Sequence, residues 1–262
     1  WKMLTYAGVE CTFSDVMSDG TGGMIAEIPP SISISNPSSS TGIGNAIAIR
    51  MAQISYSDMD TAKAAYKEKY YARHGSYPVK GGSPYKVVTG NEIYLKAHDY
   101  CLQDDPSGVG AYYASCDRGT CTAVRWAGAD DSFPVGACYG QLNYFVNQSK
   151  NPDGKWVEVN FGGDPKNLQP GDILMRSDKW ERDHGNPVTG KTGHIVTYVG
   201  KDAASAVYPN VSWKDYIVGH SSYNDRSPAL GNWYTGNTGL NTFRAFRCVR
   251  PETNSKYSSY SP

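Results

Sequence analysis

The strongest constraint on the fold is a change in the spacing of apolar residues partway along the chain. Apolar residues spaced as on one helix face predict an amphipathic helix over 43–56; they are Ile43, Ile47, Met51 and Ile54. Further helices are expected over 91–102, 116–128 and 136–147, and from Asp58 or Asp60 to Arg73. Short alternating or β-branched runs predict strands over 156–161, 172–176, 194–199, 216–218 and 243–249. Helices followed by strands indicate an α+β domain, with helices packed on an antiparallel sheet of about five strands.

A Pro- and Ser-rich stretch near the beginning of the chain has the composition of a linker. It covers 28–42, and no clear periodicity precedes it. We therefore expect 1–42 to be an N-terminal arm and linker, and 43–262 to be one domain. The chain begins Trp1-Lys2-Met3, without an initiator methionine or a signal-peptide pattern. This beginning suggests a part of a longer, multidomain protein.

The balance of charge and the hydropathy exclude some classes of partner. The chain has 25 basic and 25 acidic residues, so nucleic acid is not expected as a partner. No apolar run approaches the roughly 18 residues of a membrane span, so none is expected. The chain has 20 tyrosines and 28 glycines. A composition rich in these residues is common in secreted bacterial proteins that handle polysaccharide or peptidoglycan.

Metal and cofactor sites are not expected either. Cys116 and Cys121 lack the short paired spacing of structural zinc ligands, and the sequence has no His-x-x-x-His. It also has no glycine-rich phosphate loop. We therefore expect any chemistry to come from the side chains alone.

One cysteine lies where a helix would activate it. The expected helix over 116–128 has Ser115 as a suitable N-cap and Gly128 as a left-handed C-terminal residue. Cys116 then lies among the unpaired N–H groups of the first turn, which can lower a cysteine pKa well below about 8.5. Cys121 lies in the body of the same helix. Cys116 is therefore the expected nucleophile.

Two of the five histidines lie where they could serve such a cysteine. A cysteine nucleophile needs a base, and the base needs an orienting partner. His194 opens the expected strand over 194–199, and His220 follows the strand over 216–218, where the sequence turns polar. The remaining histidines have positions typical of structural or surface residues; they are His74, His98 and His184. His194 is the expected base and His220 the expected orienting group.

Three segments resemble the NlpC-type cell-wall cysteine peptidases, whose core is papain-like. Residues 116–128 are similar to the family's Asp-Cys-Ser-Gly-Phe-Val helix, with Asp-Arg-Gly at 117–119 in place of Ser-Gly-Phe. Residues 168–174, Leu-Gln-Pro-Gly-Asp-Ile-Leu, resemble the family's Leu-x-Pro-Gly-Asp-Leu. This second segment leads into 193–200, which resembles the family's His-Val-Gly-Ile-Tyr-Val-Gly, and the third segment, 217–222, resembles its Ile-His-Ala-Ser.

The resemblance covers about residues 110–250, with Ser115 where the family usually has Asp. It implies a papain-like fold with Cys116 as nucleophile, His194 as base and His220 as the third polar residue. It also implies a peptidoglycan hydrolase that cleaves a stem-peptide amide, with the D-glutamyl–diamino acid bond favoured. Such a protein would be secreted or associated with the cell wall, in bacteria or phage.

Residues close to the cysteine are candidates for binding the substrate. Tyr112 and Tyr113 lie just upstream and could donate a hydrogen bond to an oxyanion, or could simply pack. Arg118, within the first turn, is a candidate for binding a substrate carboxylate. Arg125 is expected to be a structural ion-pair residue.

Three alternatives remain open at this point. Residues 119–122, Gly-Thr-Cys-Thr, resemble the Gly-Gln-Cys-Thr of the related CHAP amidases, which would make Cys121 the nucleophile. The chain could instead be a cell-wall binding module, with bridged cysteines and a tyrosine face for sugars. It could also be an adaptor with an NlpC-like fold and no catalysis.

Overall fold

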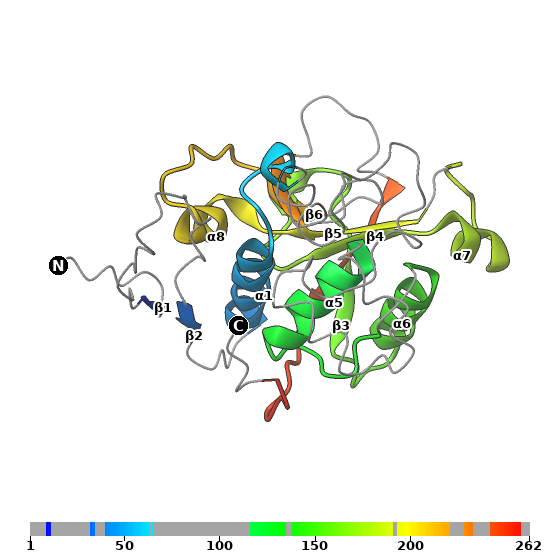
Figure 1. Cartoon of the computed structure of the whole chain (residues 1–262). Helices are drawn as coiled ribbons and strands as arrows, with labels where there is room; N and C mark the ends of the chain where they lie inside the picture. Colours follow the sequence, from blue (N-terminus) through cyan, green and yellow to red (C-terminus); the bar gives the residue numbers. More distant parts are fainter. Residues whose placement is uncertain are drawn as a thin grey trace, which may run out of the picture.

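A six-stranded antiparallel sheet forms the centre of the structure (Figure 1). Its strand order is β3-β8-β4-β5-β6-β7. Its strands are β3 (Trp156–Val159), β4 (Ile173–Arg176), β5 (His194–Tyr198), β6 (Ile217–His220), β7 (Ala229–Asn232) and β8 (Arg244–Cys248). The computed structural model describes residues 9–11, 32–34, 40–62, 64, 116–134, 138–190, 193–220, 228–232 and 242–257.

Five α-helices whose bounds the structure gives accompany this sheet in the described part of the chain. They are α1 (Ser40–Ile54), α5 (Cys116–Trp126), α6 (Cys138–Lys150), α7 (Asp178–Asp183) and α8 (Gly200–Val207). A short 3₁₀ helix covers Pro165–Asn167. Among the helices described, none is both long enough and apolar enough to cross a membrane.

The N-terminal residues contribute a separate strand pair and the beginning of α1. Strands β1 (Val9–Cys11) and β2 (Ile32–Ile34) form a two-stranded antiparallel sheet within the expected arm. Helix α1 already begins at Ser40, close to the boundary expected at residue 42.

The structure confirms the α+β class and the antiparallel sheet, but the sheet has six strands, where about five were expected. The sixth strand is β7, whose sequence Ala-Leu-Gly-Asn has no β-branched or aromatic residue and so gives little local signal. It forms because it pairs with β6, with Leu230 opposite Gly219. Helices α7 and α8 were not expected either.

Two of the expected helices lie wholly or partly outside the described residues. The expected helix over 91–102 lies outside them entirely. For the helix expected from Asp58 or Asp60, the structure shows its first turn, where the Thr61 N–H donates to Asp58 Oδ1 at 2.7 Å. Asp58 is therefore the capping residue.

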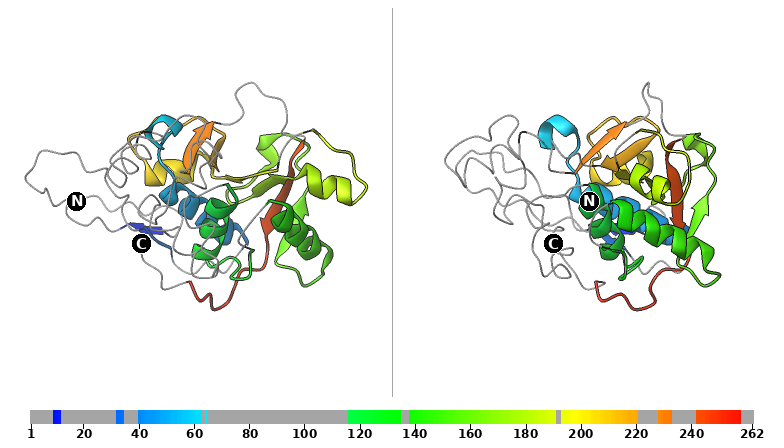
Figure 2. Two further views of the ribbon diagram at one scale, coloured as in Figure 1. Left: turned by 45° about the vertical axis from the view of Figure 1, so that its right-hand side comes forward. Right: turned by 90° about the vertical axis from the view of Figure 1, so that its right-hand side faces the viewer.

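Helix α1 is buried on nearly all sides, where the sequence predicted an amphipathic helix. It packs against both α5 and α8 and runs through the interior of the described domain (Figure 2). Ile43 and Ile47 belong to one cluster of core residues, and Met51 and Ile54 to another. Additional small and apolar residues on the other faces make this burial possible; they are Ala46, Ala48, Ile49 and Ala52.

Two glycines allow α1 to approach the sheet closely. Gly171 has a φ of +86°, and a Cβ there would lie 2.2 Å from the backbone oxygen of Gly44 in α1. A Cβ on Gly219 in β6 would lie 2.4 Å from Cγ of Met51. Larger residues at these two positions would push α1 away from the strands.

The two faces of the sheet carry separate apolar clusters. Helices α1, α5 and α6 lie on one face (Figure 1), where Ile173, Met175 and Ile195 meet Cys121 of α5 and Phe145 of α6. The opposite face is formed by alternate strand residues with three residues from connecting segments; they are Leu174, Val196, Tyr198, Val218 and Ala245 with Phe161, Leu168 and Phe243. The alternation follows the two-residue period of strands.

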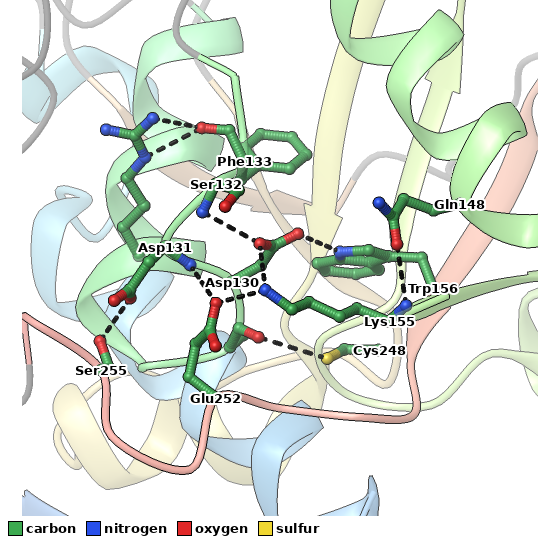
Figure 3. Close-up of polar contacts among 12 residues, drawn as sticks. Asp130, Asp131, Ser132, Phe133, Gln148, Lys155, Trp156, Cys248, Glu252 and Ser255 are labelled. Carbon is green, nitrogen blue, oxygen red and sulfur yellow. Dashed lines mark hydrogen bonds and ion pairs between the residues drawn. The ribbon is translucent and has the colours of Figure 1, made fainter. Parts of the chain in front are cut away.

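A buried carboxylate joins three parts of the chain at the end of α5 (Figure 3). Asp130 is fully buried and accepts hydrogen bonds from Tyr144 Oη at 2.6 Å and Trp156 Nε1 at 2.8 Å. Lys155 Nζ lies 3.1 Å from Asp130 and also pairs with Glu252 in the C-terminal segment. The buried charge is therefore both paired and hydrogen-bonded, as burial requires.

The Pro-Gly-Asp segment contains a second buried ion pair. Asp172 is fully buried and accepts two hydrogen bonds from Arg247, from Nε and Nη2, each at 2.7 Å. Its carboxylate also accepts the Gln169 N–H at 2.8 Å. This pair ties the segment that precedes β4 to β8.

We expect Arg247→Ala to lower the free energy of unfolding by about 3–5 kcal/mol, because Asp172 would be left buried and unpaired. The control is Lys201→Ala, which breaks an exposed pair with Asp215 at 3.9 Å. This control substitution should lower the free energy of unfolding by less than about 1 kcal/mol. Urea unfolding of both variants gives the comparison, and equal effects would contradict this account of the Asp172 pair.

Candidate functional site

Helix α5 begins at Cys116, as the sequence predicted. Asp117 lies in its first turn, and Gly128 has a φ of +70°, the left-handed conformation expected after the helix. Ser115, the expected cap, lies outside the described residues. The half-buried Cys116 therefore lies at the positive end of the helix dipole.

The sulfur of Cys116 lies at the beginning of strand β5. It is hydrogen-bonded by the Cys138 thiol, by the His194 side chain and by the backbone N–H of Ile195. Because His194 is the first residue of β5, one strand end supplies both an imidazole and a backbone donor. The structure thus brings together Cys116 and His194, which are far apart in the sequence.

These contacts hold the pKa of Cys116 well below its usual value. The largest cause is the hydrogen bond from the Cys138 thiol, and the hydrogen bond and positive charge of His194 add to it. Burial acts in the opposite direction because it disfavours the charged thiolate. The donors outweigh burial, so Cys116 favours the thiolate, the form that acts as a nucleophile.

His220 lies beside His194 on the neighbouring strand. The two ring centroids are 6.4 Å apart and the ring planes meet at 82°. Strands β5 and β6 pair with Thr197 opposite Gly219, which brings the two imidazoles to the same end of the sheet. Gly231 of β7 flanks His220, since a Cβ there would lie 3.4 Å from His220 Nε2. The two histidines and Cys116 therefore gather at one place.

Cys138 is a member of this site that the sequence analysis did not identify. It is the first residue of α6, as Cys116 is the first residue of α5. A Cβ on Gly193, next to His194, would lie 3.0 Å from Cys138 Cβ and 3.6 Å from its sulfur. The available signal was a second cysteine near the beginning of an expected helix, over 136–147. We call Cys116, Cys138, His194 and His220 the cysteine–histidine site.

The cysteine–histidine site has an aromatic and a cationic neighbour. The rings of His194 and Phe243 have centroids 6.5 Å apart, and the Arg176 guanidinium lies 4.7 Å above the Phe243 ring. Arg176 pairs with His194 across β4 and β5. Burial lowers the pKa of Arg176, while the charges of Asp178 and Cys138 oppose that shift. Arg176 thus places positive charge beside the site.

Other residues singled out in the sequence lie elsewhere or outside the described chain. Tyr112 and Tyr113 lie outside the described residues, and Arg118 is half-buried in the first turn of α5. Arg125 is buried and structural, donating from Nε to the Phe133 carbonyl at 2.9 Å and from Nη1 to Tyr257 Oη at 3.1 Å. His184 stacks on Trp180, with ring centroids 4.0 Å apart.

Cys121, the alternative nucleophile, is fully buried in the body of α5. Its sulfur lies 3.8 Å from the Phe133 carbonyl oxygen, within the apolar cluster between helices and sheet. The four cysteines whose side chains the structure describes are all free; they are Cys116, Cys121, Cys138 and Cys248. Burial sets Cys121 apart from the half-buried Cys116.

The described part of the chain contains no set of side chains arranged to bind a metal ion. No group of three or more His, Cys, Asp or Glu residues is placed there to hold a metal ion. The cysteine–histidine site instead has the parts of a nucleophile and a proton carrier.

No protein-family model matches this chain, and neither does any curated protein or solved structure with which it was compared.

The lowered pKa of Cys116 predicts an alkylation profile. As pH falls, reactivity with iodoacetamide should persist below the ordinary thiol range near 8.5 and disappear only as the lowered pKa is crossed. Cys138→Ala removes the leading hydrogen bond and should move the midpoint to higher pH. The measurement is the alkylation rate of the Cys116 peptide against pH.

The matched control for this titration is Cys121→Ser, which changes a buried sulfur in the same helix and should leave the midpoint in place. A wild-type midpoint at or above 8.5 would contradict the thiolate assignment.

Proposed function

We propose that this protein is a cysteine hydrolase that cleaves a stem-peptide amide bond of peptidoglycan, with Cys116 as nucleophile, His194 as base and His220 as orienting group. The observation that supports this most directly is the hydrogen bond between His194 and a cysteine at a helix N-terminus. A thiolate beside an imidazole is the arrangement that nucleophilic cysteine catalysis requires. The second imidazole lies on the adjacent strand with its ring centroid 6.4 Å from the first, which supports an orienting role for His220.

The reaction would proceed by acyl transfer. The Cys116 thiolate attacks the amide carbonyl carbon, and His194 gives its proton to the departing amine as the C–N bond breaks. A thioester remains on Cys116. A water molecule then gives a proton to His194 and attacks the thioester, which releases the acid and restores the thiolate.

Stabilisation of the tetrahedral oxyanion would come from backbone groups close to the nucleophile. The N–H groups in the first turn of α5 have no partner within the helix, and they lie at the positive end of its dipole. Donors fixed in this way stabilise charge that develops in the transition state. Tyr112 or Tyr113 is a further candidate donor, just upstream of Cys116.

The order of the site elements along the chain supports an NlpC-type, papain-like core. A helix begins with the cysteine, a Pro-Gly-Asp turn enters a strand, and the next two strands carry one histidine each. The D-glutamyl–diamino acid bond is the favoured target, and a secreted or cell-wall location of bacterial or phage origin follows from that substrate. Arg118 would bind a substrate carboxylate.

Two alternatives have less support from the described residues. A CHAP-like amidase would use Cys121, but that side chain is fully buried in the apolar cluster between helices and sheet. A binding module with bridged cysteines is less favoured because the four described cysteine side chains are free. An adaptor that keeps the fold without catalysis is distinguished only by an activity assay.

Incubation with purified peptidoglycan, followed by mass spectrometry of the released muropeptides, tests the proposal. We expect new stem-peptide fragments with the wild type, and a rate about 10⁴- to 10⁶-fold lower with Cys116→Ala or His194→Ala. His220→Ala should reduce the rate less, because its role is to orient another group. The mass of the fragments identifies the bond that is cut.

The same assay decides between the alternatives. Cys121→Ser should retain activity, provided that its thermal unfolding matches the wild type. A Cys121→Ser protein that is folded but inactive, beside an active Cys116→Ala, would favour the CHAP-like amidase. Equal products from the wild type and Cys116→Ala would contradict cysteine catalysis at this site.

A further inference from the structure

The two cysteines of the cysteine–histidine site are adjacent in space and both carry free thiols. Cys116 and Cys138 are hydrogen-bonded sulfur to sulfur, and each is half-buried against the same apolar cluster. Each is also the first residue of its helix. The pair is separated by 22 positions, from 116 to 138, so its closeness is a property of the fold.

A side-chain hydrogen bond joins the beginnings of α5 and α6. Gln141, fully buried in the first turns of α6, donates from Nε2 to the Asp117 carbonyl oxygen at 3.0 Å. The same nitrogen donates to the Pro134 carbonyl oxygen, also at 3.0 Å. One amide group therefore fixes α6 against the first turn of α5, which keeps Cys138 beside Cys116.

We infer that Cys116 and Cys138 form a reversible dithiol–disulfide site, which low-molecular-weight disulfides close and thiols reopen. Closure would occupy the nucleophile, so the site would act as a redox control of the hydrolase; this consequence, unlike the disulfide itself, rests on the proposed function. A secreted or cell-wall protein would meet conditions oxidising enough for closure.

The chemistry balances with a glutathione-type disulfide as oxidant. The Cys116 thiolate attacks one sulfur of the small disulfide, which forms a mixed disulfide and releases one thiolate. The Cys138 thiol then gives its proton to a thiolate or to His194 and attacks the Cys116 sulfur, releasing the second small thiol. In total two protein thiols are oxidised to one disulfide, and one small disulfide is reduced to two thiols.

The pKa values of the two cysteines are shifted in opposite directions, which suits a reaction in which one thiol attacks first and the other second. Cys116 has the lower pKa of the two, so it is more readily ionised and would react first with an oxidant. The pKa of Cys138 is raised, mainly by its hydrogen bond to Cys116 and then by burial and by the charges of Cys116 and Asp117. Once Cys116 is in a mixed disulfide, its negative charge is gone, and Cys138 is freer to ionise and attack.

The test uses the reduced full chain in glutathione buffers from reducing to oxidising, with iodoacetamide trapping and tryptic peptide mapping. Cleavage after Arg118 and Arg125 places Cys116, Cys121 and Cys138 on different peptides. We expect a cross-link between the Cys116 and Cys138 peptides, located by tandem fragmentation because Cys101 shares the Cys116 peptide. Both cysteines should lose alkylation together and regain it with dithiothreitol.

Two variants sharpen the result. Cys138→Ser should abolish the cross-link and leave a stable glutathione adduct on Cys116. The control Cys121→Ser, which alters the neighbouring buried sulfur, should cross-link as the wild type does. Both thiols remaining alkylatable in oxidised glutathione, or a cross-link from Cys116 to a different cysteine, would overturn the inference.

Hydrolysis measured on the same samples separates this inference from the proposed function. Loss of activity in proportion to the cross-link, with recovery on reduction, supports both. A protein that cross-links but hydrolyses nothing when reduced supports the dithiol site and contradicts the hydrolase. A protein that hydrolyses equally well in oxidised glutathione, with both thiols alkylatable, overturns the dithiol site alone.

Discussion

The close approach of helix α1 to the sheet is the constraint on which the rest of the structure depends. At two points the separation is too small for a side chain: a Cβ on Gly171 would lie 2.2 Å from the Gly44 oxygen, and one on Gly219 would lie 2.4 Å from Met51. Helix α5 packs against α1 on the same face of the sheet. The depth at which α1 lies therefore determines where α5 begins relative to β5.

That placement turns an ordinary thiol into an ionised one. A helix N-terminus alone favours negative charge only modestly, by about 0.3–1 kcal/mol at an exposed position. At Cys116 the helix end is joined by three donors, from Cys138, His194 and the backbone of Ile195. Burial strengthens each of these interactions while it penalises the charge itself. The lowered pKa is thus a property of the tertiary arrangement.

The sequence could predict those parts of the site that local patterns define. Cys116 at a helix beginning and His194 at a strand beginning both follow from capping residues and β-branched runs. Strand β7 could not be predicted, because its residues carry no strand signal and it exists through pairing with β6. Cys138 could not be assigned for a similar reason: its neighbour is set by the tertiary structure, in which Gln141 of α6 hydrogen-bonds to the first turn of α5.

The choice of a thiol at position 138 is informative beyond the lowered pKa of Cys116. A serine hydroxyl in the same place would be a stronger hydrogen-bond donor than a thiol, which donates only weakly. Stabilisation of the thiolate therefore does not explain why the donor is sulfur. A thiol differs from a hydroxyl in two respects: it is less polar, which suits the apolar cluster against which Cys138 packs, and it can form a covalent bond with the neighbouring sulfur. The identity of this donor therefore favours a dithiol site over a simple hydrogen-bonding role.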